Sequence, residues 1–592
     1  MTQTDWLVII LVLSGIIMYG LYKSRTTRNL DGYFLSNNCM PWYLVLLSVM
    51  GTQASAITFL SGPGQAYTDG MRFVQYYFGL PLAMVVICIT FVPLFNKLKV
   101  YTAYEYLEKR FDQKTRTLTS FLFLLQRGLS TGISIYAPSI ILSTLFGWDI
   151  FWTNFVMGGL LIIYTVSGGA KAVAYTQKLQ FIIIIIAMFL AGYMIVHLLP
   201  EHVSITDALH IGGKMGRLNV ITSGKSVKGF NWNDRYNIWS GLIGGFFLAL
   251  SYFGTDQSQV GRYITAKNNR ESRLGLLLNG LIKIPMQFCI LLIGVLIFAY
   301  YQYNTAPLTF NDALLKEVSQ SPYRDSILNL QSGYDSISRA RQGAVSRYTA
   351  ILHNGGDTTG TAAQLNGLDA QAGEYHSAFK RIASKASSKD SNDTNYIFLS
   401  FVKNHLPEGL KGLLIAIIFL AAWGSIAAAL NSLAASTVID FHKRIRDPER
   451  NEKDYTLSKW YTLAWGVFAI LIAQFSSQLG RSLIEAVNIL GSLFYGVVLG
   501  VFLVAFYIKQ VKGTATFIAA ITVEIFIVLL FFNDQLPFLS WLPDISFLWL
   551  NAVGALGVVI LSWLIQLFMS RRDPVLNIPE IDKGIVQEMN KE

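Results

Sequence analysis

Three ionisable side chains lie deep inside long apolar stretches of the sequence: Lys283, Arg127 and Glu524. Lys283 is about nine residues from the start of its stretch, which at the rise of an α-helix is roughly 14 Å. Because a charge at such depth in an apolar medium is costly, it usually faces a polar path or the interior of a helix bundle. Lys283 or Arg127 on such a path would favour an anionic organic ligand, although both stems can also carry their charges to the edge of the apolar layer.

Two apolar stretches are interrupted by glycines and small hydroxylated residues. The interruptions are Gly51-Thr52-Gln53, Ser55 and Ser61-Gly62-Pro63-Gly64 in the first stretch, and Gly241, Gly244, Gly245, Ser251, Gly254 and Thr255 in the second. In a membrane protein such interruptions mark helices that unwind to line a binding site near the bilayer midplane, where free carbonyl oxygens can hold a cation. The same glycines would also allow close helix packing, and the sequence leaves both interpretations open.

The histidines and cysteines, the residue types that enzymes and metal centres use most, form no catalytic or metal-binding pattern inside the apolar stretches. The histidines fall in predicted loops or at the ends of apolar stretches, at His197, His202, His210, His353, His376, His405 and His442. Cys39, Cys88 and Cys289 have no metal-ligand spacing and are interpreted as packing residues. Because no metal-ligand or nucleophile–base pair lies inside an apolar stretch, the sequence predicts neither an enzyme nor a bound cofactor.

The elements that must position these residues are membrane-spanning helices. The chain is 53% hydrophobic and only 14% charged, and apolar stretches recur from end to end. Each can reach the roughly 20 residues that a helix needs to cross about 30 Å of hydrocarbon. The thirteen predicted spans are Trp6–Tyr22, Trp42–Leu60, Phe73–Phe95, Leu118–Leu145, Phe151–Val166, Phe181–Leu199, Ile238–Gly254, Leu274–Tyr301, Gly412–Ile439, Tyr461–Phe475, Leu483–Tyr507, Thr516–Phe532 and Phe547–Met569. The predicted class is therefore an all-α membrane protein.

The basic residues predict how the spans are oriented. With the N-terminus outside, every inner loop carries lysine or arginine, whereas the short outer loops offer little beyond Arg72 and Arg481. This is the positive-inside pattern, and it predicts a multi-pass protein of the plasma (inner) membrane with the tail 570–592 in the cytoplasm. The net charge of +11 is assigned to this topology, so no nucleic-acid partner is predicted.

The spans also predict a repeat and an outer insertion. Spans 2–6 (41–199) and 7–11 (238–507) form two sets of five, and because five is odd the second set starts on the opposite side of the membrane. That is the parity of an inverted-topology repeat within a single domain, 1–592. The outer insertion 302–407 contains two helical stretches separated by a Gly/Thr/Asn-rich break at 354–365. A solvated two-helix cap is the simplest interpretation of it, and an external partner or lid is the alternative.

Four motifs occur in order along these spans: Ser55–Gly64, Tyr101–Phe111, Gly254–Tyr263 and Ala428–Asp440. Together they resemble the sodium:solute symporter family, which includes the sodium–glucose, sodium–proline, sodium–iodide, monocarboxylate and multivitamin transporters. The second motif, together with Ile135-Tyr136-Ala137-Pro138, looks closest to the iodide, monocarboxylate and multivitamin branch. The resemblance implies a leucine-transporter-type five-plus-five inverted repeat with flanking helices, and alternating access around a midplane site.

The resemblance also implies a site for a coupling sodium ion between the second and ninth spans. The matched positions are the carbonyls of Gly51, Ala54 and Ala421 and the side-chain positions 424 and 425. Two departures stand out. Gly424 has no side chain, which leaves Ser425 as the hydroxyl, and Gln177 replaces the acid of the Trp-Thr-Asp motif common in the family. Sodium coupling is expected, with a water, Thr52 or Ser432 completing the shell; proton coupling and uncoupled transport are the alternatives.

By the same matching, the solute is expected to meet residues of the second, third and seventh spans. Lys283 of the eighth span is added as a further candidate. The matched positions are Gln53, Thr58, Tyr76, Tyr77, Tyr252 and Phe253. Thr58 and Tyr77 replace the amide and carboxylate that grip sugar hydroxyls in sugar-carrying relatives, which argues against a hexose. Any one of these tyrosines could equally be a packing or interfacial residue.

These observations predict a secondary active transporter that couples Na⁺ to the movement of a small solute, with a preference for an organic anion. The predicted partners are the solute, Na⁺ and the lipid bilayer, and the sequence indicates no oligomeric state. The alternatives are a proton-coupled or uncoupled transporter, and a transporter-like membrane sensor. A sensor would need a separate signalling partner, because only about twenty residues follow Arg571-Arg572, too few for a folded domain.

Overall fold

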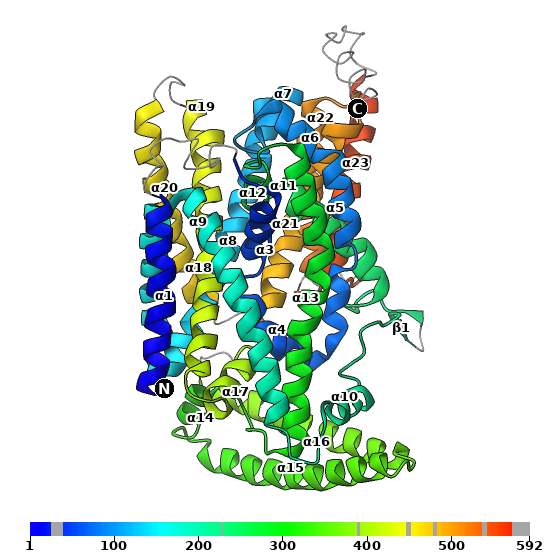
Figure 1. The fold of residues 1–592 in the computed structure, drawn as a ribbon. Coiled ribbons are helices and arrows are strands. Elements are labelled where there is room, and N and C mark those ends of the chain that lie inside the picture. Colours follow the sequence, from blue (N-terminus) through cyan, green and yellow to red (C-terminus); the bar gives the residue numbers. More distant parts are fainter. Residues whose placement is uncertain are drawn as a thin grey trace.

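The structure is a computed structural model that describes residues 1–24, 39–226, 229–387, 391–445, 451–476, 482–535 and 541–570. Its helices run side by side as an upright bundle (Figure 1). The N-terminus lies at the end of the bundle where α15 and α16 lie across it, and the last described helix, α23 (Phe547–Ser570), ends at the other. Most of the predicted tail, residues 571–592, lies outside the described residues.

The long helices of the bundle are α1 (Gln3–Ser24), α8 (Gln113–Phe146), α9 (Ile150–His197), α13 (Asn269–Tyr303), α18 (Leu410–Ser436), α20 (Asn451–Phe475), α21 (Leu483–Tyr507), α22 (Gly513–Phe531) and α23. The shorter ones are α3 (Trp42–Gln53), α4 (Ala56–Asp69), η2 (Met71–Tyr77), α5 (Leu80–Ile89), α6 (Phe91–Leu98), α7 (Glu105–Arg110), η3 (Ser240–Gly244), α11 (Gly245–Thr255), α12 (Gln257–Tyr263), η4 (Thr437–His442) and α19 (Lys443–Ile445). The remaining elements are α10 (Ile205–Lys214), β1 (Lys225–Ser226), β2 (Gly229–Phe230), α14 (Asp312–Val318), α15 (Arg324–His353), α16 (Thr359–Ala386), α17 (Ile397–His405) and η6 (Asn533–Gln535). β1 and β2 pair antiparallel as a two-stranded hairpin.

The membrane-spanning elements coincide with the predicted spans. Within the described residues, ten helices are long and apolar enough to cross a membrane, and α3 and α4 form one further bent pair. The shorter apolar helices 150–166 and 240–255 supply the other two predicted spans. The first of these is continuous with the span 173–197 in α9, whose 48 residues are more than twice what one crossing needs. The predicted all-α membrane class is confirmed.

The second predicted span is broken where the sequence analysis expected it. α3 and α4 meet at an angle of 60°, and the two residues between them, Ala54 and Ser55, leave the helical conformation. The backbone ψ angle is 76° at Ala54 and 173° at Ser55. The break frees backbone polar groups of the preceding turn, which in a membrane is tolerated where they meet protein or a cavity.

The second glycine-rich span behaves differently from the first. Gly241 and Gly245 lie on helical backbone, in η3 and α11, so of the two interpretations that the sequence left open these two glycines follow close packing. A Cβ on either glycine would collide with the backbone of η2, and the glycines therefore serve close packing. The helix is interrupted later, at Asp256, between α11 and α12. This packing brings Tyr76 of η2 next to α11.

The outer insertion folds as helices that cap one end of the bundle. Its two predicted helical stretches are found as α15 and α16, which lie across the bundle near the N-terminus (Figure 1). The predicted break 354–365 is shorter than expected, because α16 already begins at Thr359. Its last part reaches into the bundle through Asn395, whose Oδ1 accepts hydrogen bonds from Ser61 Oγ of α4 at 2.7 Å and from the Leu483 amide of α21 at 3.1 Å. The insertion is thereby tied to both helices.

Three of the four sequence motifs meet at the opposite end of the bundle. The fully buried Arg116 of α8 donates from Nε to Asp440 Oδ1 at 2.9 Å, and Thr102 Oγ1 donates to the same carboxylate at 2.8 Å. Gln257 Nε2 donates to the carbonyl of Tyr101 at 2.7 Å. Because a buried charge is stable only when paired and hydrogen-bonded, these motifs hold α8, α12 and η4 together.

Candidate solute and cation sites

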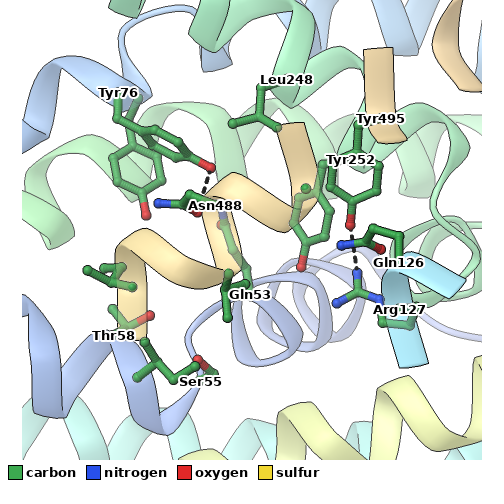
Figure 2. Close-up of a pocket in the computed structure, with 15 residues that line it drawn as sticks. Gln53, Ser55, Thr58, Tyr76, Gln126, Arg127, Leu248, Tyr252, Asn488 and Tyr495 are labelled. Atoms are coloured by element: carbon green, nitrogen blue, oxygen red, sulfur yellow. Dashed lines mark hydrogen bonds between the residues drawn. The ribbon is translucent and has the colours of Figure 1, made fainter. Parts of the chain in front are cut away.

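A cavity of about 100 Å³ lies beside the break between α3 and α4 (Figure 2). Five parts of the chain contribute to it: the α3–α4 break, η2, α8, α11 and α21. Its lining residues are Gln53, Ser55, Ile57, Thr58, Tyr76, Tyr77, Gln126, Arg127, Leu248, Tyr252, Ile484, Val487, Asn488, Gly491 and Tyr495. Aromatic faces with a few polar tips are the usual makeup of a small-molecule site.

Three of the predicted tyrosines surround this cavity. Tyr76 and Tyr77 come from η2, with their ring centroids 4.7 Å apart, and Tyr76 Oη donates to Asn488 Oδ1 at 3.1 Å (Figure 2). Tyr252 of α11 lies on the other side, and its hydroxyl accepts a hydrogen bond from Gln259 Nε2 at 2.6 Å. The hydroxyls of Tyr76 and Tyr252 are thus fixed by amide side chains, and the three rings form the aromatic wall of the cavity.

Gln53 and Thr58 line the cavity from opposite sides of the helix break. Gln53 is the last residue of α3, and no described residue bonds to its Oε1. An unpaired buried acceptor is costly, so this oxygen is available to a ligand or water. Phe253 is not among the lining residues; it is buried and packs its ring against Tyr252 with centroids 4.9 Å apart. Phe253 therefore supports the wall of the cavity from behind.

Arg127 supplies the positive charge of the cavity. It forms an ion pair with the buried Asp256, and Tyr495 Oη donates to Asp256 Oδ2 at 2.6 Å. The guanidinium carbon lies 5.4 Å from the ring centroid of Tyr252, within range of a cation–π interaction. Arg127 Nε has no hydrogen-bond partner in the part of the chain that the structure describes. One side of the guanidinium is therefore fixed by Asp256, while its Nε donor is left unpaired among the described residues.

Lys283 approaches this cavity through Tyr77, one of its lining residues. It is fully buried on α13, and its Nζ lies 5.4 Å from the ring centroid of Tyr77. Across the described ranges, no group hydrogen-bonds to this ammonium. Because Lys283 is not among the lining residues, its contact with a solute stays a prediction.

Glu524, the third deep ionisable residue, lies on α22 and takes no part in the cavity. Sequence reasoning missed the contribution of α21, which presents Asn488, Gly491 and Tyr495 on one face. Their spacing of three and four residues, with a polar amide inside an apolar span, was a usable signal. Asp256 was also missed as the partner of Arg127, although it belongs to a motif.

The predicted cation residues lie on two facing helices. Gly51 and Ala54 belong to the end of α3, and Ala421, Gly424 and Ser425 lie along α18. Ser425 Oγ donates to the carbonyl of Ala421 at 2.9 Å, which leaves the hydroxyl lone pairs for a cation. Gly424 offers no side-chain oxygen, and its carbonyl accepts a hydrogen bond from Gln177 of α9 at 3.0 Å. The Ser425 side thus presents a hydroxyl oxygen of the type that a hard cation binds, and the Gln177 amide lies on the Gly424 side, so the cation site stays a prediction.

Comparison with known proteins identifies the family. A family model described as the sodium:solute symporter family matches residues 33–321 and 371–522. The chain belongs to this family. The sodium/sialic acid symporter NanT of Aliivibrio fischeri is 24% identical over 98% of this chain and 95% of its own length. Sodium-coupled monocarboxylate transporter 1 of Homo sapiens is 31% identical over 45% of this chain and 43% of its own length.

A solved structure of a Na⁺-coupled sialic acid symporter, substrate-bound and outward-open, has the same fold. It aligns with a TM-score of 0.71 at 22% identity and covers 96% of this chain and 98% of that chain. The predicted family and its leucine-transporter-type fold are confirmed, and the chain is a multi-pass membrane symporter for a solute. The unmatched stretch 322–370 holds α15 and the start of α16, so this middle part of the insertion lies outside what the family model describes.

Proposed function

We propose that this symporter carries a small organic anion together with Na⁺, and that the anionic group of the solute binds Arg127. The observation that supports this most is the position of Arg127 in the wall of the cavity, with an unpaired Nε donor among the described residues. A guanidinium in a low-dielectric site is the preferred partner of a carboxylate. The hydroxyl and amide tips of Thr58, Gln53 and Asn488 would bind the polar part of the solute.

Charge balance gives a physical reason for coupling. Arg127 and Asp256 together are neutral, so an anion that enters the cavity adds a net negative charge to a buried site. A cation bound nearby, between Ala54, Ala421 and Ser425, offsets that charge, and each ion therefore favours binding of the other. Relatives described as sodium-coupled carriers of sialic acid and of monocarboxylates agree with an organic anion.

The orientation of the chain is part of the proposal. The insertion and the N-terminus lie at one end of the bundle, and the basic segments around Arg116 and Lys443 lie at the other (Figure 1). By the positive-inside rule, the end that carries the insertion and the N-terminus lies outside the cell, and the C-terminus lies in the cytoplasm. The membrane that the chain spans is the plasma membrane.

A proton-coupled or uncoupled mechanism is the second candidate. Gly424 and Gln177 support it, because they remove oxygen ligands from one side of the cation site.

Anion recognition can be tested by binding before any transport assay. The probes are sialic acid, lactate and pyruvate, each beside its neutral amide, added to purified protein in NaCl or in choline chloride. We expect the carboxylates to raise the unfolding temperature in NaCl, with stabilisation of about 2.7 kcal/mol at a hundred times Kd, and the amides to leave it unchanged. The double variant Arg127→Gln/Asp256→Asn keeps the site neutral and should lose this response. Equal stabilisation by the amides, or a response that survives in the double variant, would contradict the proposal.

A further inference from the structure

Gln177 of α9 lies between the two helices that carry the predicted cation residues. Its Nε2 donates to the carbonyl of Gly424 on α18 at 3.0 Å and to Thr52 Oγ1 on α3 at 3.1 Å. Its Oε1 accepts a hydrogen bond from Ser48 Oγ of α3 at 2.8 Å. The side chain is 1% exposed, so one buried carboxamide joins α3 to α18 through three hydrogen bonds.

Two glycines make room for this carboxamide. A Cβ placed on Gly51 would lie 3.2 Å from Gln177 Cβ, and one placed on Gly424 would lie 3.2 Å from Gln177 Cγ. The Cβ on Gly424 would also come within 2.7 Å of Gln180 Oε1. A side chain at 424 would therefore press on Gln177 and require the Gln180 amide to move, which connects the two departures from the family pattern. The space beside Gly424 is taken up by Gln177 and Gln180.

Between α3 and α18, the Gln177 carboxamide offers positive charge to two oxygen atoms, as a bound cation would. Its N–H groups direct partial positive charge at a backbone carbonyl and a hydroxyl on two different helices, and these are the oxygen types that a hard cation binds. Unlike an acid, a glutamine brings no negative charge that would need a counter-ion in this buried place. The amide therefore satisfies both oxygens without any ion.

We propose that the Gln177 carboxamide takes the place of one bound cation on the Gly424 side of the space between α3 and α18. The chain then holds one cation fewer there than it would with an acid at position 177. Any coupling Na⁺ is left to the Ser425 side, with Ala54 and Ala421. The number of coupling ions inferred here rests on the proposed sodium coupling. The replacement of one cation by the Gln177 amide does not depend on which solute is carried.

The test counts ²²Na⁺ bound per chain by the purified full-length protein at pH 8, without solute and at constant ionic strength with choline chloride. We expect Gln177→Glu, which introduces a carboxylate between the same oxygens, to bind one Na⁺ more than the unmodified protein. Gln177→Met, of similar length but without charge or donors, should gain none. Gln177→Asp serves the same purpose if the Glu variant does not fold.

The matched control is Gln287→Glu, which adds the same carboxylate at a fully buried position of α13, one helical turn from Lys283. We expect no additional Na⁺ there, because the lysine supplies the counter-charge. Equal Na⁺ counts for Gln177→Glu and the unmodified protein, or the same gain in Gln287→Glu, would overturn the inference. An unmodified protein that binds no Na⁺, with one bound by Gln177→Glu, would support the inference and refute sodium coupling.

Discussion

At the scale of single residues, the cavity is organised by the pair of Arg127 and Asp256. Asp256 is fully buried and Arg127 is 12% exposed, and each offsets the cost of the other, with Tyr495 as a further donor to the carboxylate. The sequence could mark Arg127 as deep and costly, because depth follows from position in an apolar stretch. It could not identify Asp256 as the partner, because that pairing depends on how α8 meets α12. The contact of Gln177 with Gly424 could not be predicted either, because it depends on how α9 packs against α18.

Breaking this ion pair on one side should destabilise the protein more than removing both partners. Arg127→Gln leaves Asp256 buried without its counter-charge, and we expect a loss of about 3–5 kcal/mol in the free energy of unfolding. Arg127→Gln/Asp256→Asn should recover most of that loss. The measurement is unfolding in detergent, with Arg72→Gln, which breaks partly exposed pairs with Asp69 and Asp234, as a control expected to cost about 1 kcal/mol per pair or less. If single and double variants were equally unstable, the pairing would not control stability.

The remaining hydroxyl of the cation site gives a second test at this scale. Ser425→Ala removes an oxygen that the site cannot replace from Gly424, and we expect the Na⁺ concentration for half-saturation to rise about tenfold, the equivalent of about 1.4 kcal/mol. Sodium-dependent thermal stabilisation measures it without a solute. Ser139→Ala, which removes a similar back-bonded hydroxyl on α8, should leave Na⁺ binding unchanged. An unaltered Na⁺ response in Ser425→Ala would place the ion elsewhere.

At the scale of elements, apolar length predicted the spans well, whereas local backbone behaviour was harder to predict. The break after Gln53 follows from a run of small and polar residues in an apolar span. Gly241 and Gly245 carry the same signal, yet they stay helical because η2 packs directly against them. Glycine alone cannot distinguish unwinding from close packing, since both need the absence of a side chain. Whether a glycine-rich segment unwinds or stays helical is determined by the element that packs against it.

The insertion should depend on Asn395 for its attachment to the bundle. Asn395→Ala removes the acceptor shared by Ser61 and the Leu483 amide, and an unsatisfied buried donor costs about 1–3 kcal/mol. We expect amide hydrogen exchange at the start of α21 to accelerate about tenfold or more. Asn354→Ala, at the exposed end of α15, should leave exchange there unchanged. No acceleration in Asn395→Ala would show that other contacts hold the insertion.

The insertion should also loosen in mild acid. Burial beside the ring of Tyr334 lowers the pKa of His376 from its ordinary value of 6.5, although Asp393 opposes the shift. The unfolded segment then binds a proton more readily than the folded one, so stability is full above pH 6.5 and falls as the pH drops towards the folded pKa. Hydrogen exchange in α16, corrected for intrinsic rates, should rise between pH 7.5 and 5.5. His376→Gln should remove that dependence; a dependence that persists would assign it to another group.

At the scale of the whole molecule, the arrangement of basic residues predicts which end of the bundle faces the cytoplasm. In a background with Cys39, Cys88 and Cys289 replaced by serine, a membrane-impermeant maleimide added to intact cells should label Asp357→Cys, between α15 and α16. Lys267→Cys, between α12 and α13, should be labelled only after permeabilisation. This labelling pattern is the one that the positive-inside rule predicts, and the reversed pattern would invert the proposed topology.

The central property of the molecule is the joint movement of an anionic solute and Na⁺ through the Arg127 cavity. The most direct measurement is uptake of labelled lactate, pyruvate and sialic acid into proteoliposomes under an inward Na⁺ gradient, a proton gradient, or neither. We predict that at least one of these anions accumulates above its outside concentration only with the Na⁺ gradient, and that Arg127→Gln/Asp256→Asn abolishes this. Accumulation that follows the proton gradient, or uptake that only equilibrates under every condition, would contradict sodium-coupled anion transport.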